Sequence, residues 1–575
     1  MLMSKLKFIV FFLGIIYANI NLNFESQYGN GYNVNDQTQD TTSYYYFENL
    51  LDINVNYRNL NLYTQLEYSN PPVYGEQTIS SKNVANSYFV EYFNDFLMLK
   101  WGNIQTINNY GLDINMFQDQ SIDFDNRIKG IELRYLPNDV VEFNYISGNG
   151  IFGTKSKGDL RVNDLNFDHK LDSYGINIYS DFGEFSISSS SKKTFYDEGI
   201  YNTLSNSDTR FAIDLQDYIF DPNYVNENSE VELNAINFSY SNTLGNFDIY
   251  IENSNNIYNK VLRKDDKDEE GYLRYFALSG DIYGMSLSYE FKDYYMLYYM
   301  PIISNPPTVF FESSSVLISR IQHNINFSDE IGHQLELSFN GKYNLSYLFN
   351  LSMGMKHSGV RNPNSFDFDE DFNFFYNDYE SVSFSDFFGS DGMDYTDEDF
   401  IAHKPFRNIY AEISRWNNNN SLYSKVGYHS HYSYDANSDK VYQTYTIPTQ
   451  FVVGFKSKNS LTTYFEYQYT KNFDPFTFEE KEFLAYKHLA LSYYINKIGS
   501  ITYLRDEENI TFLANNNFNK DNVWEGIELS LKISSTMQLS IFQGSQKGGL
   551  VCANGVCAVQ PSFEDGTKIT FRALF

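Results

Sequence analysis

The chain has 575 residues, aromatic residues make up 18% of it, and its formal net charge is −31. This acidic balance excludes the basic footprint that nucleic-acid binding requires and disfavours attraction to anionic surfaces. The mean hydropathy of −0.44 argues against a helical membrane protein, whereas a barrel, in which only alternate strand residues face lipid, allows a polar average.

The first eighteen residues have the pattern of a secretory signal peptide. Lys5 and Lys7 form a short positive region, residues 8–16 form an apolar run, and Ala18 is the expected cleavage point. No run in the chain reaches the roughly 18 apolar residues that a membrane-spanning helix needs. We therefore predict a signal peptide at 1–18 and an exported protein or barrel at 19–575.

Alternating apolar and polar residues recur along the rest of the chain. In residues 247–252 and 527–533 every second side chain is apolar, which is a strand period and not a helix period. The segments are joined by short turns, predicted near 57–60, 94–95, 137–139, 181–183, 242–245, 457–459, 496–499 and 534–536. Longer polar stretches separate the hairpins at about 103–127, 149–169, 191–229, 256–271, 294–317, 357–404 and 506–522.

Short turns that alternate with long loops are typical of a bacterial outer-membrane barrel. We predict an all-β fold with a single large antiparallel transmembrane β-barrel of roughly 22–26 strands, the number being even. Between Arg320 and His357 the pattern predicts three strands, so that either one turn is a short external loop or a strand near 301–309 is miscounted.

No N-terminal plug domain is expected, because alternation begins at Leu22 and Phe24. An array of β-sandwiches is the alternative fold, but such an array would usually show punctuation between domains.

The segment from Phe366 to Phe400 is rich in Asp and Glu and contains no Lys or Arg. Flexible, oxygen-rich segments can bind Ca²⁺, so Asp367, Asp369 and Asp371 are candidate metal ligands. The alternative is a solvated acidic loop that keeps the exposed part of the protein soluble. No other cofactor is expected.

The two cysteines, Cys552 and Cys557, flank Asn554 and Gly555. Asn-Gly is the preferred centre of a two-residue hairpin, which places the cysteines opposite each other in a closely spaced pair. We predict a disulfide formed in an oxidising compartment. A redox or metal role for the pair is the alternative, although no histidine or third cysteine lies nearby.

The last strand, residues 567–575, has apolar residues at its odd-numbered positions after Thr567 and ends on Phe575. It resembles the closing strand of Gram-negative outer-membrane barrels, whose terminal aromatic helps the assembly machinery to recognise them. Phe571 and Phe575 are therefore the predicted assembly signal. Lys568 and Arg572 fall on the opposite face and, with Lys532, are predicted to line the lumen wall.

No enzyme is indicated, because the chain has no Gly-x-Ser-x-Gly elbow, no His-Glu-x-x-His motif and no phosphate loop. A triad assembled across strands is the form of catalysis that sequence leaves open. His429 and His431 share a strand face, but no third metal ligand is identifiable.

Four places carry a family resemblance. They are Gly102 with residues 110–111 and 125–130, residues 305–308, residues 329–336, and residues 548–557 with Pro561 and Phe563. Together they resemble a poorly characterised family of large outer-membrane β-barrels that is best known from Bacteroidetes-like bacteria. This resemblance implies fold and location, and no biochemical activity.

The sequence thus predicts a monomeric outer-membrane barrel, in contact with lipid, lipopolysaccharide and the barrel-assembly machinery, that passes or binds small solutes. The competing hypothesis is a non-conducting barrel that acts as a structural or interaction protein through its long acidic loops.

Overall fold

The computed structural model describes residues 19–34, 41–70, 87–119, 124–154, 167–196, 229–260, 269–295, 306–311, 313–321, 329–355, 406–419, 421–435, 440–473, 480–512, 518–553, 556–560 and 563–575. The predicted signal peptide at 1–18 and the predicted cation ligands Asp367, Asp369 and Asp371 lie outside these residues. The prediction that no plug precedes the first strand therefore stays a prediction.

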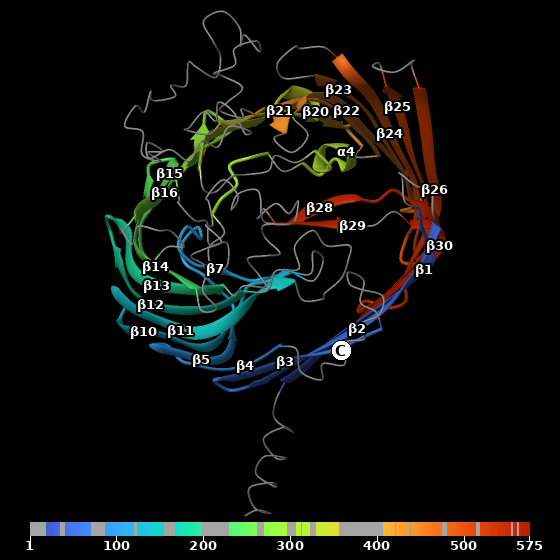
Figure 1. Ribbon diagram of the computed structural model, residues 1–575. Coiled ribbons are helices and arrows are strands. Elements are labelled where there is room, and N and C mark those ends of the chain that lie inside the picture. Colours follow the sequence, from blue (N-terminus) through green and yellow to red (C-terminus); the bar gives the residue numbers. More distant parts are fainter. Residues whose placement is uncertain are drawn as a thin grey trace, which may run out of the picture.

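Within the described residues, 24 antiparallel strands pair with their neighbours and close into one barrel (Figure 1). This confirms the predicted all-β class and falls within the predicted range of strand number. The described helical elements are the short turns α4 and η1. Closure pairs every barrel strand on both edges, which satisfies the backbone groups that an open sheet would leave unpaired.

The first twelve barrel strands are β1 (Asn19–Val34), β2 (Thr41–Tyr57), β3 (Leu60–Ser69), β4 (Ser87–Phe93), β5 (Leu97–Ile104), β10 (Ile128–Asn138), β11 (Val141–Thr154), β12 (Phe167–Ser180), β13 (Gly183–Tyr196), β14 (Ser229–Leu244), β15 (Phe247–Lys260) and β16 (Glu269–Ile282). The other twelve are β17 (Met285–Tyr295), β18 (Asp329–Asn340), β19 (Leu345–Met355), β20 (Phe406–Trp416), β21 (Leu422–Asp435), β22 (Lys440–Gly454), β23 (Ser460–Phe473), β24 (Glu480–Ile495), β25 (Gly499–Phe512), β26 (Phe518–Lys532), β27 (Met537–Gln546) and β30 (Phe563–Leu574).

The remaining elements lie between barrel strands. They are β6 (Thr106–Ile107), β7 (Asn115–Met116), β8 (Gln118–Asp119), β9 (Phe124–Asp125), the helical turn α4 (Val316–Ser319), the 3-10 turn η1 (Lys342–Asn344), β28 (Gly549–Ala553) and β29 (Val556–Gln560). Figure 1 shows β7, α4, β28 and β29 inside the ring of strands.

Short turns gather at one end of the barrel. They join β2 to β3, β12 to β13 and β14 to β15, among others, with two residues each. Gly245 and Gly284 have φ angles of 68° and 83° in such turns, a conformation that glycine adopts without steric cost. The start of β1 and the end of β30 lie at the same end, since Asn19 pairs with Asn56 beside the first turn.

The barrel closes between its first and last strands. The β1–β30 register runs from Asn23 opposite Leu574 to Tyr32 opposite Glu564. Leu22 and Phe575 then exchange backbone hydrogen bonds of 2.9 and 2.8 Å. Backbone pairing between the first and last strands therefore continues to Phe575.

The region between β17 and β19 differs from one of the expectations. Between Arg320 and His357 the described residues form two strands, β18 and β19, and not three. The preceding residues 306–311 form no strand, and Ser315 caps α4 by accepting from the Ile318 backbone N–H. Pro306 and Pro307 lack backbone N–H donors, which explains why this segment joins no sheet.

Candidate functional site in the barrel lumen

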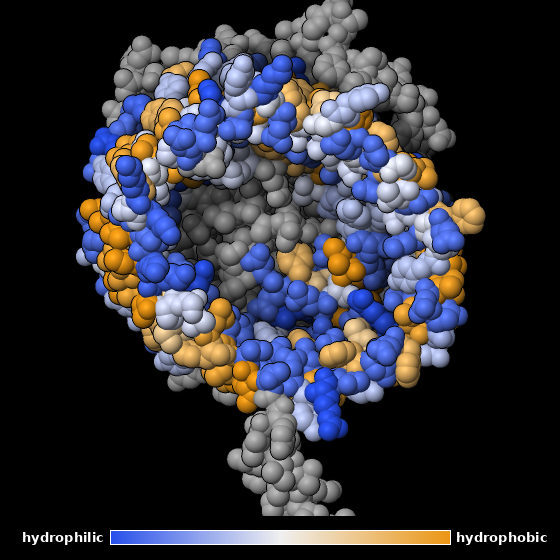
Figure 2. Space-filling view, turned by 180° about the vertical axis from the view of Figure 1, so that it is seen from behind, coloured by the Kyte–Doolittle hydropathy of each residue, from blue (hydrophilic) through white to orange (hydrophobic). Residues whose placement is uncertain are grey.

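The two faces of the barrel wall differ in polarity. Along β14, Asn237 and Ser239 are buried on the lumen side, whereas Ile236 and Phe238 are exposed on the outside. Figure 2 shows a hollow whose visible wall is mainly hydrophilic, with hydrophobic side chains on the outer flanks. The same outer exposure is found on most strands, for example at Leu62, Trp101, Ile131, Phe143, Ile176, Ile187, Ile251, Ile413, Val426, Ile447, Phe465, Ile501 and Ile527.

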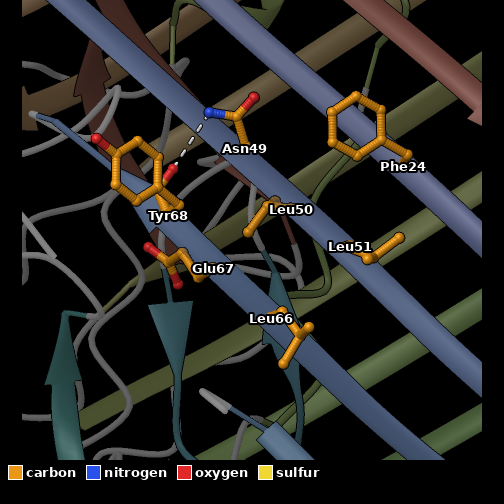
Figure 3. Close-up of a pocket in the computed structure, with 7 residues that line it drawn as sticks. All are labelled: Phe24, Asn49, Leu50, Leu51, Leu66, Glu67 and Tyr68. Atoms are coloured by element: carbon orange, nitrogen blue, oxygen red, sulfur yellow. Dashed lines mark hydrogen bonds between the residues drawn. The ribbon is translucent and has the colours of Figure 1, made fainter. Parts of the chain in front are cut away.

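An apolar groove of about 340 Å³ lies on β1–β3 (Figure 3). Phe24, Leu51 and Leu66 stand in one row of the sheet, because Phe24 is opposite Leu51 and Leu51 is opposite Leu66. Leu66 shares its strand face with the exposed Leu60 and Leu62, so that this row belongs to the outer surface. This row of side chains is apolar and carries no polar or titratable group.

The first inward segment, of which residues 105–119 and 124–127 are described, is held to the wall by a buried ion pair. The Lys192 ammonium lies 2.7 Å from the Asp113 carboxylate, and the two side chains are 3% and 0% exposed. Ser190 donates a hydrogen bond of 2.7 Å to the same carboxylate. Arg127 binds Asp125 at 2.8 Å and so closes the segment where it joins β10.

Tyr110 anchors the tip of this segment against β15. Its backbone N–H donates to the Glu252 carboxylate at 3.1 Å, and its ring lies 4.2 Å from the ring of Tyr250. Burial raises the pKa of the Tyr110 hydroxyl, and the carboxylates of Glu290 and Glu252 raise it further. This hydroxyl therefore stays neutral at physiological pH.

The second inward segment, residues 306–321, crosses from β17 to β23. At its first end, the Lys292 ammonium donates to the Thr308 carbonyl at 2.7 Å. At the other end, the Glu466 carboxylate accepts the N–H groups of Val316 and Leu317 at 2.9 and 2.6 Å. One carboxylate thus holds the first turn of α4.

The same segment continues to β25 through a charged group. Arg320 lies 3.4 Å from Asp506, and Asp506 is also 2.8 Å from Nδ1 of His488. On the β20 side, the ring of Phe311 stacks on Tyr410 at 4.7 Å. The segment is therefore anchored to at least three parts of the wall.

The third inward segment carries the β28–β29 hairpin. The Lys547 ammonium at its base lies 2.9 Å from the Glu508 carboxylate and 4.0 Å from the centre of the Tyr486 ring. Burial lowers the pKa of this ammonium, and the Glu508 carboxylate partly offsets that effect. Cys552 and Cys557 are directly opposite in the hairpin register. Their side chains lie outside the described residues, and the disulfide stays a prediction.

The other sequence-predicted residues lie along or near the closing strand. Phe571 packs near Phe24, with ring centres 6.2 Å apart, and Phe575 is 62% exposed at the short-turn end. On the opposite strand face, Lys568 donates to Gln546 at 2.7 Å and Arg572 donates to Glu25 at 3.0 Å. Lys532 is exposed at the end of β26. The structure does not bring the three cations into one cluster.

The histidine pair that shares a strand face is buried. His429 and His431 are 0% and 2% exposed, their rings are 6.1 Å apart, and His429 contacts the Asn408 side-chain oxygen. Among the described residues, no group of three or more His, Cys, Asp or Glu side chains is arranged to hold a metal.

Sequence reasoning missed the residues that anchor the inward segments, above all Asp113, Lys192 and Glu466. A signal existed for Lys192 and Glu466, because each is a charged residue at an inward-facing strand position. Their partners are 79 and about 150 positions away, and no periodicity connects them.

A family comparison covers nearly the whole chain. The profile of a family of unknown function, DUF6029, matches residues 3–575. The chain belongs to the DUF6029 family. No functionally curated protein is detectably similar to it in sequence.

Solved barrels are similar to this DUF6029 protein in fold. The siderophore receptor PirA from Pseudomonas aeruginosa is 8% identical with a TM-score of 0.42, over 97% of this chain and 80% of that one. The copper transporter OprC is 8% identical with a TM-score of 0.43, over 97% of this chain and 80% of that one. A BenF-like porin from Pseudomonas fluorescens is 9% identical with a TM-score of 0.35, over 74% of this chain and 96% of that one. At these values the likenesses carry no statement about function.

Separately, no helix in the described part of the chain is both long and apolar enough to cross a membrane.

Proposed function

We propose that this DUF6029 protein is an outer-membrane β-barrel that admits small polar solutes to its lumen and passes or binds them. The observation that carries the proposal is the opposite polarity of the two wall faces. An outer face rich in exposed apolar side chains suits hydrocarbon, and a polar inside suits water and polar solutes. The closed pairing of β1 with β30 leaves no unsatisfied strand edge towards lipid.

The proposal limits the solutes to small ones. A barrel of 24 strands is wide enough to enclose an aqueous channel or a plugged lumen. The described parts of three inward segments, within 105–127, 306–321 and 547–560, occupy part of that space and are fixed by buried charges. Their anchors favour a narrowed passage over a wide pore.

The decisive experiment is conductance across a planar lipid bilayer, measured with purified, refolded protein. Stepwise ion conductance is expected, and heat-denatured protein at equal detergent concentration is the control. A correctly folded barrel that never conducts would exclude passage and favour the second candidate function.

Location is tested separately by membrane fractionation and gel mobility. We expect the protein in the outer-membrane fraction, with a mobility that changes on heating because the folded barrel resists detergent. Recovery as a soluble periplasmic protein without a heat-modifiable form would contradict the proposal.

The second candidate is a non-conducting barrel that acts as an interaction protein. It is favoured by the anchoring of the inward segments, particularly the grip of Glu466 on α4. Under either function we expect a monomer that contacts lipopolysaccharide and the barrel-assembly machinery and has no enzymatic activity. We also propose that Asp367, Asp369 and Asp371 bind a cation and that the protein comes from Bacteroidetes-like bacteria.

A further inference from the structure

A polar pocket lies between the first inward segment and the barrel wall. Residues 107–109 cover it, and the wall is formed by four consecutive strands, β10–β13, with a volume of about 80 Å³. Such a volume exceeds the roughly 10–15 Å³ that one water molecule requires. The pocket can therefore hold a small solute in addition to water.

The hollow has a simple origin in the sheet register. Asn144 is opposite Gly175, and Gly175 is opposite Ser188, so that the three residues form one row across β11, β12 and β13. The missing side chain of Gly175 leaves a gap between the other two. A Cβ added there would meet Ser188 Cβ at 3.4 Å and Asn144 Cβ at 3.6 Å, which is ordinary contact.

Two side-chain oxygens at this gap have no partner among the described residues. Asn144 Oδ1 and Ser188 Oγ are both buried without a hydrogen bond, and Ser188 as a whole is only 5% exposed. Both residues line the pocket. Buried polar atoms are normally paired, so that unpaired oxygens facing a cavity indicate a hydrogen-bonding occupant.

The charge of the pocket lining indicates which occupant fits. Arg134 donates to Glu132 at 3.0 Å, and this pair is internally neutral. Among the described residues, the Glu142 carboxylate accepts a hydrogen bond only from the neutral side-chain amide of Asn177, at 3.0 Å. Two carboxylates and one guanidinium leave a net charge of minus one beside the two unpaired oxygens.

We infer that this pocket binds a small primary ammonium compound with a second polar group. The ammonium group supplies N–H donors to the Glu142 carboxylate and to Asn144 Oδ1, and a hydroxyl elsewhere on the solute reaches Ser188 Oγ. A cation neutralises the excess carboxylate, and charge-assisted hydrogen bonds are the stronger ones.

The test uses three probes of nearly equal size and different charge, namely ethanolamine, ethylene glycol and glycolate. Each is titrated into refolded protein in detergent micelles, and binding is followed by saturation-transfer NMR. Ethanolamine is expected to bind in roughly the millimolar range, since so few heavy atoms limit affinity, and the order should be ethanolamine, then ethylene glycol, then glycolate. Equal or tighter binding of ethylene glycol, or no binding of any probe, would overturn the inference.

Variants locate the binding. Glu142→Gln should weaken ethanolamine about tenfold and leave ethylene glycol unchanged, since it removes only the charge. Glu184→Gln is the matched control, because Glu184 is an exposed carboxylate of β13 that does not line the pocket. An equal loss in both variants would mean that the general field of the lumen, and not this pocket, attracts the cation.

Gly175→Leu should abolish binding of all three probes by filling the gap. If that variant fails to give a heat-modifiable barrel, Gly175→Ala takes its place, since a single Cβ fits at ordinary contact distances. Unchanged binding of the probes in a folded Gly175 variant would show that they bind elsewhere in the protein.

This inference rests on the proposed function only in placing solutes in the lumen. Binding in micelles requires no conductance, so the two can fail independently. A barrel that binds ethanolamine and never conducts would support the binding pocket and exclude passage through the lumen. A barrel that conducts without binding ethanolamine would support passage and exclude the binding pocket.

Discussion

Asp113 and Lys192 form an ion pair of 2.7 Å in which neither side chain is more than 3% exposed, although 79 positions separate them. This pair fastens the first inward segment to β13. A buried charge that loses its partner is costly in free energy, so that replacing one member of the pair should destabilise this part of the lumen.

Lys192→Met should release residues 105–127 from the wall. The lone Asp113 carboxylate would then be buried without its counter-ion, at a cost of about 3–5 kcal/mol. We expect faster amide hydrogen exchange in residues 105–119 and a larger single-channel conductance. The double variant Asp113→Asn/Lys192→Met should be less affected than Lys192→Met, because no unpaired charge remains.

Lys170→Met is the matched control for that prediction. Lys170 lies 2.9 Å from Asp172, but its side chain is 46% exposed on the outer face of β12. Removal of this pair should leave exchange in residues 105–119 unchanged. Similar exchange in the two single variants would show that the Asp113–Lys192 pair does not hold the segment.

Glu466→Gln should loosen the second inward segment at α4. The carboxylate accepts two backbone N–H groups, and an amide can accept with only one of its two polar atoms. One N–H would lose its partner, at about 1–3 kcal/mol. Exchange of the amides of residues 316–318 should accelerate.

Glu528→Gln provides the comparison for Glu466, since Glu528 is also a lumen-side carboxylate and accepts from Ser540 at 2.7 Å. It should not change exchange in α4. An unchanged α4 in the Glu466 variant itself would count against the anchoring role.

Phe575→Asp should reduce the yield of folded barrel more than Lys568→Asp does. Phe575 is 62% exposed where the chain closes on Leu22, and from the resemblance to closing strands we expect its ring to take part in assembly. Lys568 lies on the opposite strand face and donates to Gln546. The measurement is the heat-modifiable fraction after expression, and equal yields would argue against this assignment of faces.

Replacing Cys552 and Cys557 with serine should leave the barrel assembled. A bridge between them closes a very small ring and contributes only about 2 kcal/mol. The β28–β29 hairpin should instead become easier to cleave by protease. Alkylation of unreduced native protein gives the direct check, because free thiols there would disprove the pairing.

The sequence alone determined the fold class, most of the short turns and the two faces of the last strand. These features depend on local periodicity, and a period of two leaves little freedom about which side chains face the same way. The register of Cys552 opposite Cys557 followed from the same local rule, because a two-residue turn fixes it.

Only the tertiary structure decided what fills the lumen. The sequence pattern predicts loops at 103–127 and 294–317. Their described parts fold inwards because charged residues on distant strands hold them, Lys192 in the first case and Glu466 in the second. Likewise, the gap at Gly175 exists only because β11 and β13 place Asn144 and Ser188 on either side of it. Such contacts depend on strand order and register around a closed ring, which the local pattern of a single strand does not contain.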